Sequence, residues 1–265
     1  MEFEDFLRQV APLLGLQWRL FRRGGIKRKI ERRITEVELS DVGDYLSRVK
    51  ADPEEQAVLS QILRVTISRF FRDRKVFDAL ATFVFPKILR KQDHLRIWSI
   101  GCASGEEPYS LSILLKETAG RLWPRIDPYL LATDISGSLL ARAREGKYKK
   151  SSLKEVPEKI LQDYFRADQG SYRLDPVIRE SVEFDRHDIL HDKPFLGMDV
   201  VFCRNLAFTY FSKESQMGIL KKIAGSLQEE GYLVLGKEET LPLMYPTLFV
   251  PVFPAEKIYQ KFLQK

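Results

Sequence analysis

Two adjacent carboxylates, Glu106 and Glu107, follow a glycine-containing turn in the segment RIWSIGCASGEEPYS, residues 96–110. The apolar run before the turn is typical of a short buried strand, and the run after it is typical of a helix. Phosphate-binding loops at such a turn leave the helix N-terminus free for an anion. Two carboxylates here would repel a phosphate and attract a cation, although glutamates also stabilise a helix N-terminus through its dipole.

Another acidic residue, Asp134, lies in the segment LLATDIS. An acid after the second strand of a nucleoside-binding sheet accepts hydrogen bonds from a ribose diol, and a helix cap is its alternative role. The common nucleoside that carries an ammonium group and no phosphate is S-adenosylmethionine. Glu107 and Asp134, with the turn that begins at Gly101, therefore predict a site for this cofactor. Loss of its methyl group gives S-adenosylhomocysteine as the product.

The elements that must position these residues change in type near residue 90. Earlier residues show helical spacing of apolar side chains, whereas later ones alternate between short apolar runs and helical patterns. The expected strands are 96–100, 129–133, 182–185, 199–203 and 232–236, and the expected helices are 106–117, 136–145 and 212–228. This alternation predicts an α/β fold with a Rossmann-like, doubly wound parallel sheet.

Three regions follow from this pattern. We expect a helical N-terminal domain over residues 1–90, a cofactor-binding catalytic domain over 91–265, and a small β-hairpin subdomain over 151–184 within it. In the first region, Asp52 before Pro53 predicts the capped start of a helix, whereas Gly24 and Gly25 are expected to break the chain. The closing segment PVFPAEKIYQKF is compatible with a final antiparallel strand.

Composition narrows the class of protein. The 265 residues, 44% of them apolar, are enough for a full hydrophobic core. No apolar run approaches the roughly 18 to 20 residues of a membrane span, and the start MEFEDFLRQV lacks signal-peptide order, so we expect a cytoplasmic protein without membrane insertion. Cys102, Cys203 and three scattered histidines predict neither a disulfide framework nor a metal site.

A basic cluster occupies residues 19–33, where eight Lys and Arg residues stand against one acid, Glu31. The apolar stripe of Ile26, Ile30 and Ile34 should turn the charged side chains outward. The outward set consists of Arg28, Lys29, Arg32 and Arg33. This set is either a solvated helix face or a docking surface for an acidic protein or nucleic acid, and the lack of interleaved aromatic residues disfavours RNA.

Four segments, in order, resemble the motifs of the CheR-type chemoreceptor glutamate methyltransferases: RVTISRFFRD, RIWSIGCASGEEPYSLSILL, LLATDIS and VFCRNLAFTYFS. The resemblance covers nearly the whole chain and implies a class I methyltransferase sheet behind a small helical domain. It implies transfer of the methyl group of S-adenosylmethionine to glutamate carboxylates, giving methyl esters. The implied partner is an acidic helical segment of a chemoreceptor or related signalling protein, and we expect the enzyme to be a monomer.

The resemblance also implies roles for individual residues. Arg72 of FFRD corresponds to an arginine that reaches the cofactor and the reacting centre, and Tyr210 corresponds to a functional tyrosine. The residues that match cofactor contacts are Thr66, Ser68, Arg72, Gly101, Glu107, Asp134, Asp188, Ile189, Asn205 and Leu206. Among these, Thr66 and Ser68 stand where the family usually has Asn and Thr, and Asp188 stands where it more often has Asn.

The spacing around Tyr210 departs from the family pattern. Tyr210 lies five residues after Asn205 instead of four, so Thr209 stands in the usual tyrosine position. Either a bulge restores Tyr210 or a different residue lies near the methyl group. We favour Tyr210 because the following Phe211 preserves the family's Tyr-Phe pair. The short insert at 165–184 resembles members that do not use a receptor's C-terminal tether peptide.

The implied reaction needs no general base, because a glutamate with an ordinary pKa of about 4.3 is already ionised at neutral pH. Arg72 and Tyr210 would act by positioning the reacting groups. Two alternatives remain. One is a methyltransferase that acts on RNA or a small molecule, since a fold does not fix the substrate. The other is a non-catalytic cofactor-binding regulatory module, which the altered tyrosine spacing motivates.

Overall fold

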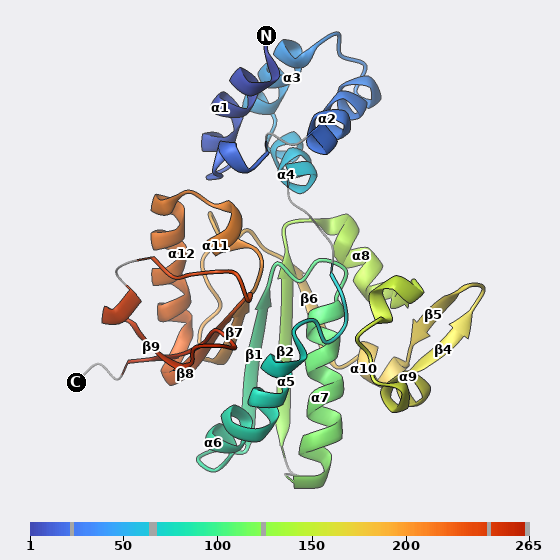
Figure 1. The fold of residues 1–265 in the computed structure, drawn as a ribbon, viewed down its shortest axis with the longest axis vertical. Coiled ribbons are helices and arrows are strands. Elements are labelled where there is room, and N and C mark those ends of the chain that lie inside the picture. The colour runs from blue at the N-terminus through green and yellow to red at the C-terminus, as the bar shows by residue number, and fades with distance from the viewer. Residues whose placement is uncertain (22–23, 64–67, 123–125, 243–244, 263–265) are drawn as a thin grey trace.

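The computed structural model describes residues 1–21, 24–63, 68–122, 126–242 and 245–262 (Figure 1). The N-terminal helices are α1 (Phe3–Leu13), η1 (Trp18–Phe21), α2 (Gly24–Glu36), α3 (Val42–Ala51) and α4 (Pro53–Leu63). They lie together at the top of Figure 1. No helix among the described residues combines the length and apolar character that a membrane span requires.

The start of α4 confirms the predicted cap. A side-chain oxygen of Asp52 accepts a hydrogen bond from the backbone N–H of Glu54 at 2.9 Å, and Pro53 is the first helical residue. The predicted break at Gly24 and Gly25 is wrong, because both glycines belong to the first turn of α2. The first turn of a helix tolerates glycine because its N–H groups have no intrahelical partners.

A seven-stranded sheet forms the centre of the molecule. Its strands are β1 (His94–Ile100), β2 (Asp127–Asp134), β6 (Val182–Arg186), β7 (Met198–Cys203), β8 (Leu227–Leu235), β9 (Phe249–Phe253) and β10 (Ile258–Lys261). Their order is β6-β2-β1-β7-β8-β10-β9, with β6 to β8 parallel and β10 antiparallel to both neighbours. This order confirms the predicted doubly wound sheet, and it reverses between β1 and β7, where such sheets bind ligands.

Helices cover both faces of the sheet. They are α5 (Arg74–Ala79), the π-helical η2 (Leu80–Val84), α6 (Phe85–Leu89), α7 (Glu106–Leu122), α8 (Gly137–Glu145), α11 (Ala207–Tyr210) and α12 (Lys213–Ser226). Successive residues of β1 belong to different buried clusters: Trp98 shares one with residues of the N-terminal helices and α12, whereas Ile97 shares the other with residues of α5, α6 and α7. Residues 70–89 thus pack with the sheet, and the domain limit at residue 90 stays a prediction.

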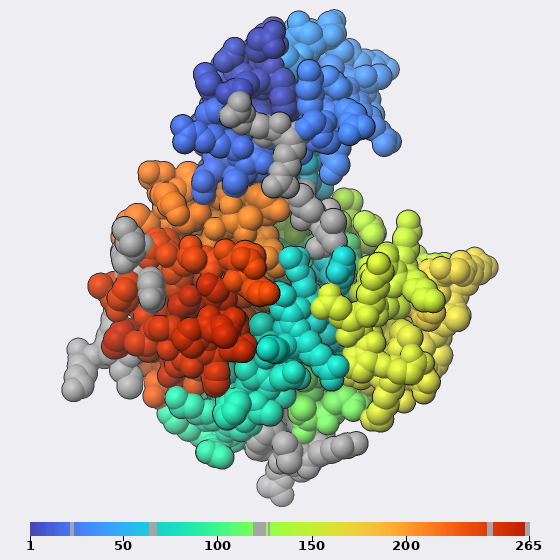
Figure 2. Space-filling model, in the orientation of Figure 1, coloured from blue at the N-terminus to red at the C-terminus, as the bar shows by residue number. Residues whose placement is uncertain are grey.

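The insert forms a second, smaller sheet, seen in yellow at the right of Figures 1 and 2. Its elements are β3 (Lys147–Tyr148), η3 (Lys150–Leu153), α9 (Glu158–Tyr164), β4 (Phe165–Asp168), β5 (Ser171–Leu174) and α10 (Pro176–Arg179). The strand order is β3-β5-β4, all antiparallel. The β4–β5 hairpin falls where a hairpin was expected. Strand β3 lies before the expected range, and it was not predicted because two residues are too few to show the alternation of a strand.

The C-terminal segment contains two antiparallel strands, β9 and β10, where the sequence suggested one. β9 lies at the edge of the sheet and contains Pro251. An edge strand tolerates a proline because the N–H groups on its outer side have no neighbouring strand to donate to, so the missing N–H of proline breaks no hydrogen bond. The proline weakens the strand pattern in the sequence without preventing the strand.

Candidate functional site

The turn after β1 is fixed to the end of β2. The backbone N–H groups of Gly101 and Cys102 donate to the carbonyl oxygen of Thr133 at 2.7 and 3.0 Å. Gly101 has φ +71°, and a Cβ there would lie 2.5 Å from Cδ2 of Leu206. Only glycine fits, because any other residue would combine backbone strain with a steric clash.

Asp134 joins the same two strand ends. One carboxylate oxygen accepts from the backbone N–H of Ala103 at 3.0 Å, and the other accepts from that of Ser136 at 2.9 Å. A carboxylate offers about four lone-pair sites, so these two hydrogen bonds alone do not use its full acceptor capacity. Its contact with a ribose stays a prediction.

The two glutamates that follow the turn face different surroundings. Oε1 of Glu107 accepts from the Ser99 hydroxyl at 2.8 Å, and its Oε2 lies 3.1 Å from Nη1 of Arg204. Glu106 is only 5% exposed and turns toward Ser152, and burial raises its pKa. The expectation that both carboxylates face one cation is therefore wrong, because consecutive helical residues point roughly 100° apart.

Arg204 links three parts of the site. It follows β7 directly, and its side chain is 3% exposed. Besides Glu107, the guanidinium contacts Oδ2 of Asp73 at 2.6 Å and the carbonyl oxygen of Arg72 at 3.1 Å. A buried guanidinium needs such partners to offset its desolvation. Arg204 is not among the residues predicted from the sequence, although its position at the end of a central strand, in the segment VFCRN, is a usable signal.

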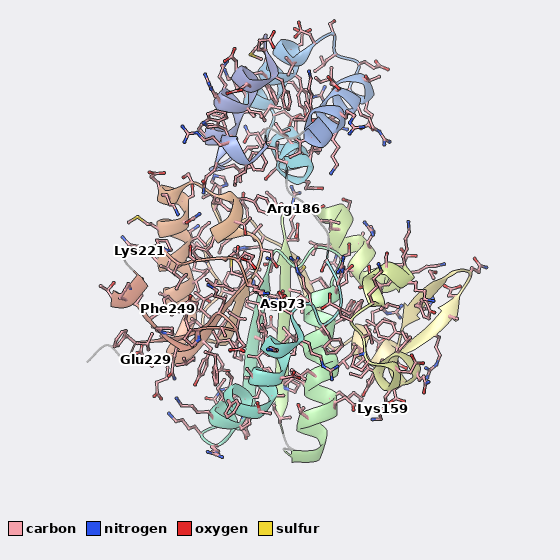
Figure 3. The ribbon with its side chains drawn as sticks, in the orientation of Figure 1. Asp73, Lys159, Arg186, Lys221, Glu229 and Phe249 are labelled. Atoms are coloured by element: carbon pink, nitrogen blue, oxygen red, sulfur yellow. The ribbon has the colours of Figure 1, made fainter. Side chains whose placement is uncertain are left out.

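The segment before α5 presents Arg72 to the site. Its neighbours Phe71 and Asp73 both have positive φ, 54° and 61°, which is uncommon for residues with a side chain. The backbone N–H of Phe71 donates to the Ser110 hydroxyl at 2.9 Å, and the Arg204 contact holds Asp73. These contacts fix a strained loop, seen near the label of Asp73 in Figure 3.

A second missed residue, Glu239, organises the loop after β7. Its buried carboxylate accepts from the backbone N–H groups of Asn205 at 2.7 Å and Leu206 at 3.0 Å. It also accepts from the Thr209 hydroxyl at 2.7 Å. Glu239 lies 34 residues after Asn205, in a segment without a recognisable motif, so the sequence offered no signal for this contact.

Glu239 therefore binds the side chain that stands in the usual tyrosine position, Thr209. Tyr210 ends α11, and its ring stacks beside Phe21 at a centroid distance of 6.2 Å. The backbone carbonyl of Tyr210 accepts from the N–H of Gln17 at 2.9 Å. Tyr210 thus contacts the N-terminal helices, and its place near a methyl group stays a prediction.

A small pocket at the switch point collects several of the predicted residues. Its lining consists of Ser68, Arg69, Arg72, Phe77, Gly101, Cys102, Ala103, Glu107, Arg204 and Asn205. The volume of this switch-point pocket is about 70 Å³, well below the roughly 300 Å³ of a usual ligand site. An acid and arginines in one lining suit a ligand that carries both an ammonium and a carboxylate.

The remaining predicted cofactor residues lie elsewhere. Asp188 lines a cleft of about 330 Å³ that α4 and the loop after β6 share. Its carboxylate accepts from the N–H of Leu190 at 2.9 Å and contacts Nδ1 of His191 at 2.8 Å. Ile189 is buried in the core with the N-terminal helices. Thr66 lies outside the described residues.

The predicted docking set on α2 divides into two kinds of residue. Arg28 and Lys29 are exposed, and Arg32 is 81% exposed and pairs with Glu36. Arg33 is only 25% exposed and contacts both carboxylate oxygens of the buried Glu55, at 2.9 and 2.8 Å. The prediction that Arg33 points outward is wrong, because an acid on α4 within its reach holds it inward.

The family described as CheR methyltransferase, SAM binding domain, matches residues 66–255. The chain belongs to this family. A chemotaxis protein methyltransferase of Listeria monocytogenes is 33% identical over 89% of this chain and 88% of its own. Chemotaxis protein methyltransferase 1 of Pseudomonas aeruginosa is 35% identical over 77% of each chain. An uncharacterised 104.1 kDa protein of Rhodobacter capsulatus is 32% identical over 91% of this chain, which spans only 26% of that longer protein.

Membership of the CheR family confirms the predicted cofactor, S-adenosylmethionine, and the methyltransferase class. The matched residues include the turn at Gly101, both strand ends that Asp134 joins, and the loop that Glu239 organises. The roles of the individual residues stay predictions.

Proposed function

We propose that this protein transfers the methyl group of S-adenosylmethionine to glutamate side chains of a chemoreceptor-like signalling protein and so forms glutamate methyl esters. The observation that carries the proposal is the lining of the switch-point pocket, where Glu107 lies among arginines and the described lining holds no histidine. Relatives named chemotaxis protein methyltransferases support the choice of substrate. The cytoplasmic location and the monomeric state remain predictions that accompany this proposal.

The residues of the switch-point pocket fit the amino-acid end of the cofactor. Glu107 keeps free lone pairs for an ammonium group, and Arg72 offers a guanidinium for a carboxylate. Gly101 lets the backbone approach a ligand closely. The bound cofactor supplies an electrophilic methyl group on a sulfonium centre.

The protein's residues would act by alignment and by exclusion of water. The acceptor glutamate is ionised at neutral pH, so no residue has to remove a proton from it. Arg72 would orient the carboxylate of the cofactor as well as the incoming glutamate carboxylate, and well-oriented reactants gain roughly 7 to 11 kcal/mol over free ones. Tyr210 would add a hydrogen bond to that carboxylate.

The buried thiol of Cys102 lies in the same lining. Burial, together with the charges of Asp134 and Glu107, raises the pKa of this thiol well above its ordinary value. A thiolate is the nucleophilic form of cysteine, so a neutral Cys102 does not compete for the methyl group. Burial is the main cause of this shift in pKa, and the neighbouring carboxylates add to it.

The exposed charges of α2 support an acidic protein as partner. Arg28, Lys29 and Arg32 face solvent, whereas the carboxylate of Glu55 takes up the charge of Arg33. Opposite charges on a Glu-rich helical segment would accelerate its encounter with this surface. A solvated helix face remains the alternative to docking.

The test is incubation of the protein with methyl-labelled S-adenosylmethionine and candidate receptor fragments. We expect a base-labile label and a mass increase of one CH2 unit on glutamate-containing peptides. A base-stable label would contradict the proposal and point to methylation of nitrogen or carbon in another substrate.

One observation favours a second candidate, a cofactor-binding regulatory module without catalysis. Thr209 binds Glu239, and Tyr210 stacks beside Phe21, so neither side chain is part of the described pocket lining. Tight binding of the cofactor without transfer to any receptor fragment would support the module.

A further inference from the structure

A second cavity, of about 470 Å³, adjoins the switch-point pocket. The start of α7, the end of α8 and the β3–η3 segment of the insert surround it, and Ser68 and Arg69 line both cavities. Figure 2 shows the yellow-green insert segment beside the cyan segment on this face. We call this cavity the insert pocket. Its lining consists of Ser68, Arg69, Ser104, Glu106, Arg142, Glu145, Lys147, Tyr148, Lys149, Ser151, Ser152, Lys154 and Ser171.

The rim of the insert pocket carries an excess of positive charge. Arg69 lies 3.5 Å from Glu155, and Lys147 lies 3.2 Å from Asp168, so these two cations are compensated. Three further cations, Arg142, Lys149 and Lys154, are exposed and have no ion pair to a described residue. Against them the lining holds two acids, Glu106 and Glu145. A free anionic group is therefore the complement of this rim.

The floor of the insert pocket holds a polar atom without a partner. Oε2 of Glu106 is buried and makes no hydrogen bond within the part of the chain that the structure describes. Beside it, the Tyr148 hydroxyl donates to the carbonyl oxygen of Ser104 at 2.7 Å and so fixes the floor. Burial raises the pKa of Glu106. Because burial disfavours the charged form of Glu106, this carboxyl group repels an entering anion less than an exposed acid would.

We propose that the insert pocket binds an acidic side chain of the methyl-accepting protein, next in space to the glutamate that is methylated. The inference rests on the proposed function, which it extends from the reacting carboxylate to its neighbours. On a helix, residues three or four apart have Cβ atoms about 5 to 6 Å from one another, so their side chains lie on one face. Because Ser68 and Arg69 belong to both linings, one segment can place two acids in the two pockets.

An acidic protein segment fits the insert pocket better than a nucleic acid does. The only aromatic residue of the described lining, Tyr148, is buried and presents no face for a base to stack on. Serine hydroxyls, which make up five of the lining residues, donate readily to carboxylates.

The test compares two double variants with the same change in charge. The first is Lys149→Glu with Lys154→Glu at the insert pocket. The control is Lys213→Glu with Lys221→Glu on α12, where both lysines are exposed; Figure 3 labels Lys221 on the side opposite the insert. We expect the first variant to raise the KM for an acidic receptor fragment about ten-fold. Its kcat and its affinity for S-adenosylhomocysteine should match those of the control.

A binding measurement separates this inference from the proposed function. A fluorescent Glu-rich helical peptide is titrated into each protein saturated with S-adenosylhomocysteine. Weaker binding by the pocket variant alone supports the insert pocket, even if the wild-type protein transfers no methyl group. Equal binding by both variants overturns the inference, even if methyl transfer is normal. Displacement of the peptide by an RNA oligomer at lower concentration than by a competing Glu-rich peptide would also overturn it.

Discussion

Nη1 of Arg204 lies 3.1 Å from Oε2 of Glu107, inside the protein. The carboxylate that the sequence offers to a cationic ligand is thus already paired with a buried cation. This pairing fixes the direction of the Glu107 side chain, which no sequence pattern specifies. The site therefore depends on a balance of charges that Arg204 sets, and not on bare negative charge at the helix N-terminus.

Replacement of Arg204 should disturb stability and cofactor binding together. In Arg204→Met, the carboxylates of Glu107 and Asp73 lose their shared partner, and loss of one partner of a buried ion pair costs about 3 to 5 kcal/mol. Arg204→Lys should lose less, because the charge remains while the forked geometry does not. Urea unfolding gives the free energies, and calorimetry gives the affinity for S-adenosylhomocysteine. Unfolding free energies within 1 kcal/mol of wild type for both variants would contradict this role.

Replacement of Glu239 tests the loop after β7. In Glu239→Gln, the amide NH2 must face backbone N–H groups that donate to the carboxylate in the native protein. Each buried donor left without an acceptor costs about 1 to 3 kcal/mol. We expect lower stability and weaker binding of S-adenosylhomocysteine, because Asn205 belongs to both the loop and the pocket. Glu238→Gln, at the exposed neighbouring residue, is the matched control and should behave as wild type.

The parts of the fold that the sequence predicts are those that one segment specifies by itself. Val200 to Cys203 form a fully buried apolar run, and such a run between turns indicates a central strand. Gly101 is recognisable as a turn because apolar residues precede it and helical spacing follows it. Local patterns of this kind determine the order of strands and helices, and with it the edge of the sheet where the site lies.

The contacts between distant segments could not be predicted in the same way. Glu107 and Arg204 are 97 residues apart, and nothing in either segment indicates that one neutralises the other. The inward turn of Arg33 depends on Glu55, which lies on a different helix. Glu106 and Glu107 look equivalent in the sequence, and only the packing of α7 shows that their side chains face different surroundings. Side-chain direction and charge pairing therefore required the structure.

The pair of Arg33 and Glu55 predicts acid sensitivity of the N-terminal helices. The hydrogen bond from Arg33 is the main cause that lowers the pKa of Glu55 in the folded protein. An acid with a lowered folded pKa stabilises the fold above its unfolded pKa of about 4.3 and loses that effect as the pH falls. We expect the free energy of unfolding to drop below about pH 4.5, and to drop less steeply in Glu55→Gln. Identical pH profiles for the two proteins would contradict the link.

Two arginines on one helix provide a matched comparison. Arg33→Ala leaves the buried Glu55 without its main partner and should cost about 3 to 5 kcal/mol. Arg32→Ala removes an exposed pair with Glu36 and should cost less than about 1 kcal/mol. Chemical unfolding of both variants at neutral pH measures the difference. Equal losses would show that exposure does not distinguish the two residues.

Charge reversal on α2 tests the docking surface without touching the Arg33 pair. In Arg28→Glu with Lys29→Glu, both altered residues are exposed, so stability should stay within about 0.5 kcal/mol of wild type. We expect slower methylation of an acidic receptor fragment, chiefly through weaker capture, and a flatter dependence on salt. The double variant of Lys213 and Lys221 is again the control. An unchanged methylation rate at low salt would show that these charges form a solvated helix face and do not dock the substrate.

The altered spacing around Tyr210 gives a comparison between two neighbouring hydroxyl groups. Tyr210→Phe keeps the ring beside Phe21 and removes only the hydroxyl, so its kcat is compared with that of wild type together with its stability and cofactor affinity. If the hydroxyl positions the acceptor carboxylate, kcat should fall by up to about ten-fold, as loss of one hydrogen bond implies. Thr209→Val should instead weaken cofactor binding, because the Thr209 hydroxyl donates to Glu239. Single-turnover kinetics with calorimetry separate the two effects. A fall in kcat for Thr209→Val at unchanged cofactor affinity, with Tyr210→Phe fully active, would assign the positioning role to Thr209.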